Sequence, residues 1–250
     1  MKKFLIILFI LIVVLTIIFL IINFKSKKME VKKIDFLTSD GVKIVANYYP
    51  NKNAKFAGIL IHMRPKTKES YEKFARYLQE KNFSLLALDL RGHGESRESP
   101  WGYLDYNQFS EDEEKKSIKD LEAASNFLEK EGFSQERQFL VGASIGANLS
   151  FQFISENEKI KAAVLLSPGY NYRGIILDNF YKKGLDNKLM IISSKDDQEM
   201  ALRGFNWFKE KYPSSTFIFL EKGGHGTNYF DFYPELMDKI YSWLLEKLSL

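Results

Sequence analysis

The sequence predicts an α/β fold built on a mostly parallel, eight-stranded sheet with helices on both faces. From about residue 30 onward, short apolar segments typical of strands alternate with longer segments typical of helices. A hairpin-like pair of strands precedes this alternation, and the repeated strand–helix units favour parallel pairing. In such sheets the ligand crevice lies beyond the carboxyl ends of the strands. The residues that directly follow each strand are therefore the candidates for function.

The predicted strands share runs of apolar, often β-branched or aromatic residues. The first two flank the turn Ser39-Asp40-Gly41, which indicates a hairpin. The other six alternate with helix-like segments, as in a parallel sheet. The eight strands are predicted at residues 31–38, 42–49, 56–62, 83–89, 137–143, 160–167, 188–193 and 215–221.

The predicted helices carry apolar residues three or four positions apart. One begins with Ser110 and Glu113 in the spacing of a capping box and stops at Gly132. The last carries leucine or isoleucine at every fourth position from Leu236 to Leu248. The helices are predicted at residues 68–82, 110–131, 145–154, 197–212 and 236–248.

The N-terminal residues 1–28 are interpreted as a transmembrane signal anchor and basic linker, separate from a domain at 29–250. Residues 4–22 are apolar except for Thr16 and long enough to cross a bilayer. No small-residue cleavage site follows, so we expect an uncleaved anchor, with a cleaved signal peptide as the alternative. The lysines after the segment favour a cytoplasmic domain. The short basic start resembles an export signal instead, and we expect the domain on the outer side of the membrane.

Composition removes several classes of function. The chain has no cysteine, which excludes disulfides, thiolate zinc sites and a cysteine nucleophile. The formal charge is only +4 and the lysines are scattered, so we expect no nucleic-acid partner. His62, His93 and His225 are the whole supply of imidazoles for metal binding or base catalysis. We expect neither a metal nor a cofactor.

The segment from Gly142 to Gly146 has the pattern G-x-S-x-G, with Ser144 at its centre. A strand is predicted before it and a helix after it, which is the context in which this motif holds a nucleophilic serine on a sharp turn. The alternative is a tight strand-to-helix connection without chemistry. The pentapeptide by itself does not decide between them.

Five strand ends carry a pattern that resembles the α/β-hydrolase family, in particular its serine esterases and dienelactone hydrolases. The resemblance covers roughly residues 31–250 and implies the α/β-hydrolase fold. In that family a serine, an acid and a histidine follow one another along the chain. The five segments are "HMRPK" (62–66), "DLRGHGES" (89–96), "VGASIG" (141–146), "SSKDDQ" (193–198) and "KGGHGTNYF" (222–230).

The resemblance implies a triad of Ser144, Asp197 and His225. Imidazole takes the serine proton during attack on a carbonyl, and a carboxylate orients the imidazole. Either Asp196 or Asp197 fits the end of the seventh strand. Aligning the apolar run of that strand favours Asp197, and Asp196 would then face solvent beside Lys195.

The resemblance also implies an oxyanion hole formed by backbone N–H groups. The donors are expected from the loop after the third strand, either Met63 or Arg64, and from Ile145 directly after the nucleophile. Met63 replaces the glycine that is usual in the family, which leaves the first donor open. His62 is expected to hydrogen-bond beneath this loop, and His93 is given no catalytic role.

The expected function is a serine hydrolase that cleaves a carboxylic ester or related acyl bond of a small-molecule substrate through an acyl-enzyme. A peptidase or thioesterase using the same triad is the alternative, followed by a non-catalytic binding protein of the same fold. Relatives with a large helical lid insert it between the sixth and seventh strands. Because only residues 168–187 lie there, the sequence predicts a minimal lid. The substrate and the oligomeric state are left open.

Overall fold

The computed structural model describes residues 13–14 and 29–248 of the 250-residue chain. The expected membrane segment 4–22 and the linker up to residue 28 lie outside the described residues, apart from Val13 and Val14. Within the described part, no helix has the length and apolar character needed to cross a membrane. The sheet and helices all belong to one compact unit, Val31–Leu250.

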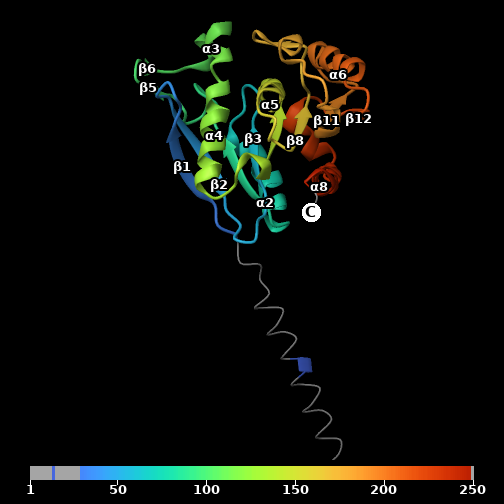
Figure 1. The fold of residues 1–250 in the computed structure, drawn as a ribbon, viewed down its shortest axis with the longest axis horizontal. Helices are drawn as coiled ribbons and strands as arrows, with labels where there is room; N and C mark the ends of the chain where they lie inside the picture. The colour runs from blue at the N-terminus through green and yellow to red at the C-terminus, as the bar shows by residue number, and fades with distance from the viewer. Residues whose placement is uncertain (1–12, 15–28, 249–250) are drawn as a thin grey trace, which may run out of the picture. The chain divides into compact units, whose positions relative to one another are not determined.

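The described part of the chain forms one ten-stranded sheet, in the order β12-β11-β8-β7-β3-β4-β2-β5-β6 with β1 paired to β2 (Figure 1). Six neighbouring strands, from β12 to β4, run parallel, and the remaining pairs are antiparallel. The strands are β1 (Lys32–Leu37), β2 (Lys43–Tyr49), β3 (Ala57–Ile61), β4 (Ser84–Leu88), β5 (Glu98–Ser99), β6 (Gly102–Tyr103), β7 (Gln138–Ala143), β8 (Ala162–Leu166), β11 (Leu189–Ser194) and β12 (Thr216–Leu220).

The mostly parallel α/β fold is confirmed. The predicted number of strands, eight, is too low, because the sheet has ten. The additional strands β5 and β6 have two residues each and join the sheet through the pairing of Lys43 with Glu98. Such short strands contain no apolar alternation, so the sequence does not indicate them. A separate two-stranded sheet, β9 (Asn171–Tyr172) with β10 (Ile175–Ile176), lies between β8 and β11 in the chain.

The helices cover both faces of the sheet (Figure 1). One face packs against α4, α5 and α6, and the other against α2, α7 and α8. The α-helices are α2 (Glu72–Glu80), α3 (Glu111–Lys115), α4 (Ile118–Lys130), α5 (Ile145–Glu156), α6 (Glu199–Lys211), α7 (Tyr229–Phe232) and α8 (Leu236–Lys247). The 3-10 turns are η1 (Lys68–Tyr71), η2 (Tyr106–Gln108), η3 (Gln135–Arg137), η4 (Leu177–Phe180), η5 (Asp186–Lys188) and η6 (Gly226–Asn228).

The helix predicted at 110–131 is two helices. The capping box is present, since Ser110 and Glu113 bond each other's backbone N–H. At Lys116 and Ser117 the helical pattern changes, because their N–H groups donate hydrogen bonds to the carbonyls of the residues three positions earlier. The break turns α3 toward the loop after β3, while α4 packs on the sheet and ends before Gly132, as predicted.

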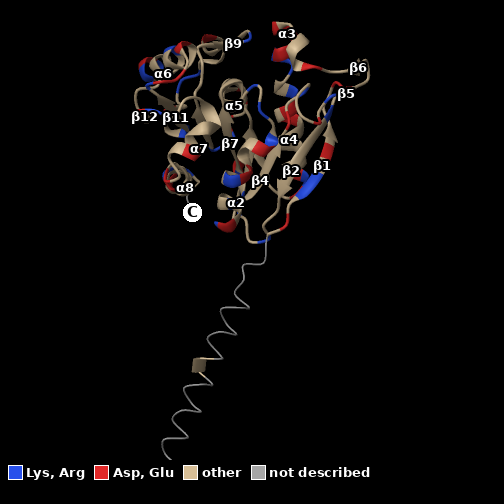
Figure 2. Ribbon diagram, turned by 180° about the vertical axis from the view of Figure 1, so that it is seen from behind, with Lys and Arg blue, Asp and Glu red and all other residues tan. Residues whose placement is uncertain are grey.

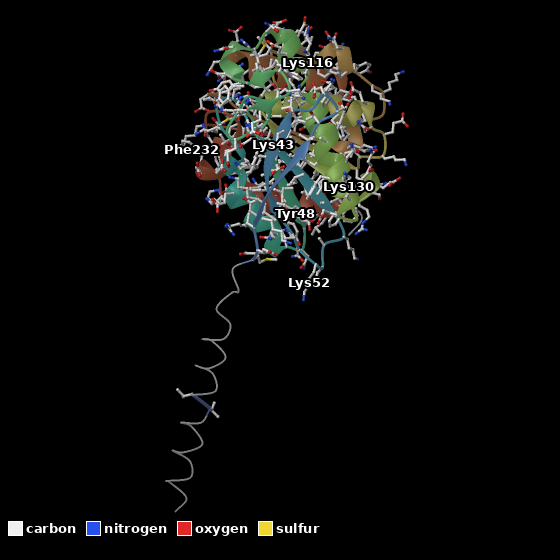
Figure 3. All side chains as sticks on the ribbon, turned by 90° about the vertical axis from the view of Figure 1, so that its left-hand side faces the viewer. Lys43, Tyr48, Lys52, Lys116, Lys130 and Phe232 are labelled. Atoms are coloured by element: carbon white, nitrogen blue, oxygen red, sulfur yellow. The ribbon has the colours of Figure 1, made fainter. Side chains whose placement is uncertain are left out.

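Lysine, arginine, aspartate and glutamate are interspersed over the domain (Figure 2). The labelled Lys43, Lys52, Lys116 and Lys130 in Figure 3 extend to different sides of it. Lys43 is paired with Glu98 at 2.7 Å.

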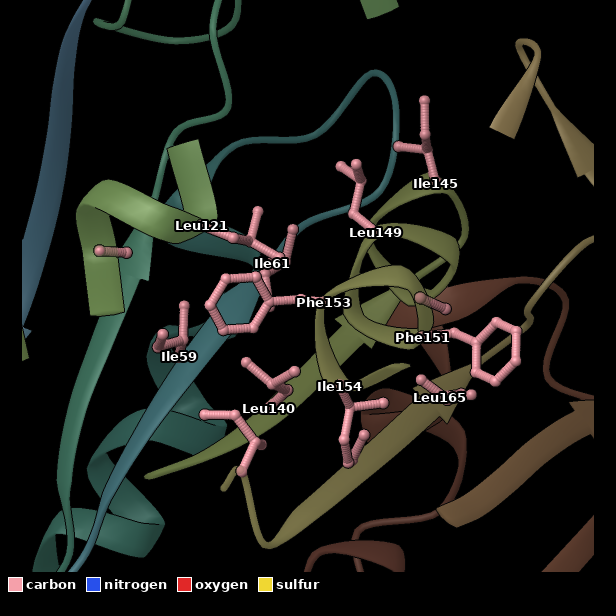
Figure 4. Close-up of a cluster of buried hydrophobic side chains, with 14 of the residues drawn as sticks. Ile59, Ile61, Leu121, Leu140, Ile145, Leu149, Phe151, Phe153, Ile154 and Leu165 are labelled. Atoms are coloured by element: carbon pink, nitrogen blue, oxygen red, sulfur yellow. The ribbon is translucent and has the colours of Figure 1, made fainter. Parts of the chain in front are cut away.

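The core holds the nucleophile-bearing segment in place. Phe153 of α5 lies over Ile59 and Ile61 of β3 and Leu140 of β7, all fully buried (Figure 4). Each such side chain contributes about 1.5–3 kcal/mol of burial free energy. The helix α5 is therefore held against β3 and β7.

Candidate active site

Ser144 sits on a strained turn between β7 and α5. Its backbone has φ 55° and ψ −120°, in a region that side-chain-bearing residues rarely occupy and that costs about 1–3 kcal/mol. A Cβ on Gly142 would lie 2.1 Å from the Gly146 carbonyl oxygen, and one on Gly146 would lie 2.3 Å from the Ile61 carbonyl oxygen. Both glycines of the motif are therefore required by close backbone approach.

Asp197 and His225 are in direct contact. The Oδ1 atom of Asp197, in the turn after β11, lies 2.5 Å from Nδ1 of His225, in the loop after β12. The carboxylate can accept the proton on this ring nitrogen, which leaves Nε2 free to act as a base. Asp197 is buried, so water does not compete for the contact.

The other partners of Asp197 keep it ionised. Its Oδ2 atom accepts hydrogen bonds from Ser193 Oγ at 3.0 Å and from the Tyr229 hydroxyl. The N–H of Gln198 donates to Oδ1 at 2.8 Å. Burial alone raises the pKa of Asp197, but the hydrogen bonds from His225 and Tyr229 outweigh it and hold this pKa below its usual value.

Asp196 has a different set of partners. Its carboxylate is exposed and accepts from Ser194 Oγ at 2.7 Å and from the N–H groups of Gly224 and Gly223 at 3.1 and 3.3 Å. Asp196 faces solvent as expected, and the neighbouring Lys195 approaches Glu221 at 4.0 Å. Asp196 thus ties the turn after β11 to the loop that carries His225 without touching the imidazole.

The loop of His225 packs against the residue before Ser144. A Cβ on Gly226 would lie 3.3 Å from the Ala143 Cβ and 2.5 Å from the Met63 sulfur. The described contacts contain no hydrogen bond between the Ser144 hydroxyl and His225. Such bonds are commonly long before a substrate binds.

The expected oxyanion donors lie around the start of α5. Ile145 is the first residue of α5, so its N–H has no carbonyl partner within the helix. The loop after β3 approaches the same point, since a Cβ on Gly146 would lie 2.8 Å from the His62 carbonyl oxygen. Met63 is buried, whereas the Arg64 guanidinium extends to Glu114 at 3.1 Å.

The two remaining histidines lie beneath this loop. His62 is fully buried and accepts a hydrogen bond at Nε2 from the Leu90 N–H, 3.0 Å away. His93 is buried, stacks on Tyr106 with 3.9 Å between ring centroids, and has an unpartnered Nε2. Burial lowers the pKa of His93 to about 3. Within the described residues, no group of three or more His, Asp or Glu side chains could hold a metal ion.

Residues 52–196 match the family model of serine aminopeptidases, S33 (Hydrolase_4). This match covers more than half of the chain. The chain belongs to this family. The matched region of the S33 serine aminopeptidases includes Ser144, while Asp197 and His225 lie beyond its end.

Other comparisons agree with an α/β hydrolase. The AB hydrolase superfamily protein YisY of Bacillus subtilis is 24% identical over 164 residues, which are 61% of this chain and 54% of YisY. The chain thus spans about half the length of this curated relative. Among solved structures, the esterase Pf2001 of Pyrococcus furiosus is similar with a TM-score of 0.69 at 20% identity, over 88% of this chain and 92% of the esterase. Est1E of Butyrivibrio proteoclasticus, solved with ferulic acid bound, has a TM-score of 0.70 at 16% identity, over 87% of this chain and all of Est1E.

Sequence reasoning missed several polar residues around the site of this S33 family member. Asn148 of α5 donates to the carbonyls of Gly169 and Ile175 at 2.8 and 2.9 Å, and so ties the nucleophile helix to the β9–β10 hairpin. The sequence feature that could have indicated Asn148 is its polar amide within a mostly apolar helical segment. Tyr229 and Tyr172 gave no signal, because aromatic residues near a strand end are ordinary core residues.

Proposed function

We propose that the protein is a serine hydrolase that cleaves a carboxylic ester through an acyl-enzyme on Ser144. The observation that carries the proposal is the buried contact between Asp197 and His225 near a serine held at positive φ. A structural serine or histidine does not need this strained turn or this ionised partner. Membership of the hydrolase family supports the same conclusion.

The residues account for both steps of the reaction. Ser144 Oγ attacks the carbonyl carbon while its proton moves to Nε2 of His225, and Asp197 stabilises the imidazolium. The N–H of Ile145 and an amide of the loop after β3 stabilise the oxyanion. The bond to the leaving oxygen then breaks, and His225 returns the proton to that oxygen. Water repeats the sequence on the acyl-enzyme and releases the acid.

An aminopeptidase is the second candidate, because the matched family is described by that activity. Such an enzyme must bind the cationic amino terminus of its substrate, for which a carboxylate is the natural partner. Glu114 contacts the β9–β10 hairpin, but Arg64 and Arg173 already lie 3.1 and 3.6 Å from its Oε2. This neutralised carboxylate favours an ester over an aminoacyl amide.

A substrate panel tests the proposal. Short acyl esters, acyl thioesters and aminoacyl amides would be assayed with the purified protein and its Ser144→Ala variant. We expect ester cleavage that Ser144→Ala abolishes while circular dichroism stays unchanged. Preferential cleavage of the amides would establish the aminopeptidase instead, and unchanged turnover in folded Ser144→Ala would remove the serine mechanism.

We also propose that residues 4–22 anchor the hydrolase domain 29–250 to a membrane, with the domain on the outer side. The apolar composition of the segment supports an anchor. Sedimentation of the full chain with membranes after carbonate washing tests it. Protease added to intact cells should degrade the domain, whereas protection of the domain would place it in the cytoplasm.

A further inference from the structure

The hydroxyl of Tyr172 is a buried donor without a partner beside the proposed nucleophile. Tyr172 lies on β9, and its hydroxyl oxygen makes no hydrogen bond within the described structure. The ring meets the His225 ring edge-on, with 6.2 Å between centroids. The Ser144 hydroxyl is near enough to interact electrostatically with the phenol, without the geometry of a hydrogen bond. A buried donor left unpaired costs about 1–3 kcal/mol, so its retention calls for a partner that arrives with the substrate.

The surroundings of Tyr172 hold the ring in this position. Gly169 faces the ring so closely that a Cβ there would lie 2.4 Å from it. Asn148 fixes both ends of the β9–β10 hairpin through the carbonyls of Gly169 and Ile175. The next residue, Arg173, donates to the Phe109 carbonyl at 2.7 Å. The hydroxyl is therefore positioned before a substrate binds.

The phenol can donate a hydrogen bond but does not release its proton. Burial, followed by the negative charge of Asp197, raises the pKa of Tyr172 well above its usual value. At neutral pH the hydroxyl is thus a neutral donor that makes no hydrogen bond to the described residues. An oxygen that gains negative charge during the reaction is the natural acceptor.

The topology indicates which oxygen this is. In the sheet β7 lies between β3 and β8. The oxyanion amides come from the β3 side and the start of α5, whereas Tyr172 follows β8, and His225 follows β12 on that same side. The leaving-group oxygen is the one that faces His225, because the imidazole must protonate it. We propose that Tyr172 donates a hydrogen bond to the leaving-group oxygen, an inference that rests on the proposed esterase function.

Two acetate esters test this role in the full-length chain. p-Nitrophenyl acetate and benzyl acetate form the same acetyl-enzyme, so the oxyanion donors and deacylation are common to both. They differ in the leaving oxygen, since p-nitrophenolate departs without help and an alkoxide does not. We expect Tyr172→Phe to lower kcat/KM for benzyl acetate about 10- to 100-fold, the value of one hydrogen bond to a charged group. The loss for p-nitrophenyl acetate should stay below about 3-fold, since little charge is left for that bond to stabilise.

Matched variants separate the possible outcomes. Tyr170→Phe removes the hydroxyl that bonds Asp178 in the same segment and should leave both rates unchanged. An equal loss on both esters in Tyr172→Phe, or no loss on either, would overturn the leaving-group role. Unchanged cleavage of both esters by Ser144→Ala would instead overturn the proposed function. Because the buried Tyr172 hydroxyl has no partner, Tyr172→Phe should unfold at or above the wild-type temperature.

Discussion

At the scale of single residues, Asp196 and Asp197 show how neighbours with the same chemistry acquire different roles. Asp197 touches His225, whereas Asp196 bonds the backbone of Gly223 and Gly224. We expect Asp197→Asn to reduce kcat about 10⁴-fold, because an amide favours the wrong imidazole tautomer. Asp196→Asn should lose less than about 10-fold, since its amide oxygen can still accept from the glycines. Steady-state kinetics on a short ester measure both, and the reverse order would move the acid by one residue.

The ionisation of Asp197 has a consequence for stability. Its pKa in the folded protein lies below the usual value of 3.8. The stabilisation from its ionised hydrogen bonds is therefore complete above that usual value and is lost as the pH falls through the lower, folded-state pKa. The difference in melting temperature between wild type and Asp197→Asn should be larger at pH 7 than at pH 3. Thermal unfolding at both pH values measures it, and a difference that grows on acidification would contradict the assigned direction.

At the scale of elements, two buried ion pairs hold the loop after β4. Lys68 contacts Asp89 at 2.7 Å, and Arg91 contacts Asp120 of α4 at 2.8 Å, all four side chains being buried. Without Asp120, the Arg91 guanidinium keeps its ion pair with Asp40 at 3.0 Å, but the buried Arg91 N–H loses its acceptor. A hydrogen bond to a charged group contributes about 1.5–3 kcal/mol, so we expect Asp120→Ala to lower the free energy of unfolding by about that amount in urea denaturation. The control Glu122→Ala, on the exposed face of the same helix, should change it by less than about 0.5 kcal/mol.

The elements also show which features the sequence could reveal. Each of the eight predicted strands exists. The six parallel strands have apolar runs that need no tertiary context, and the turn at residues 39–41 indicated the antiparallel pair β1 and β2. The two-residue strands β5 and β6 and the break between α3 and α4 were missed, since they depend on pairing with β2 and on the position of Glu114. Tertiary contacts decide such features, and periodicity does not record them.

In the candidate site too, local sequence indicated some residues, and others depend on tertiary contacts. Ser144 and His225 were indicated by a motif and by chain order, which local sequence carries. The choice of Asp197 over Asp196 depended on counting along a strand, and the contact with His225 supplies an independent reason for it. The position of Tyr172 beside the site could not be predicted from the sequence, because it results from a hairpin that Asn148 of α5 holds through hydrogen bonds.

At the scale of the whole molecule, the proposed catalytic groups all lie within the domain 29–250. Ser144 follows the carboxyl end of β7, which lies among the parallel strands, and the contacts described around it come from residues of the same domain. A fragment of residues 29–250 should therefore be soluble and cleave a water-soluble ester with kcat/KM within about two-fold of the full chain, because the first 28 residues supply none of the proposed catalytic groups. Parallel assays of the fragment, the full chain and the fragment with Ser144→Ala measure this, and a ten-fold loss in the folded fragment would show that the N-terminal residues contribute to the site.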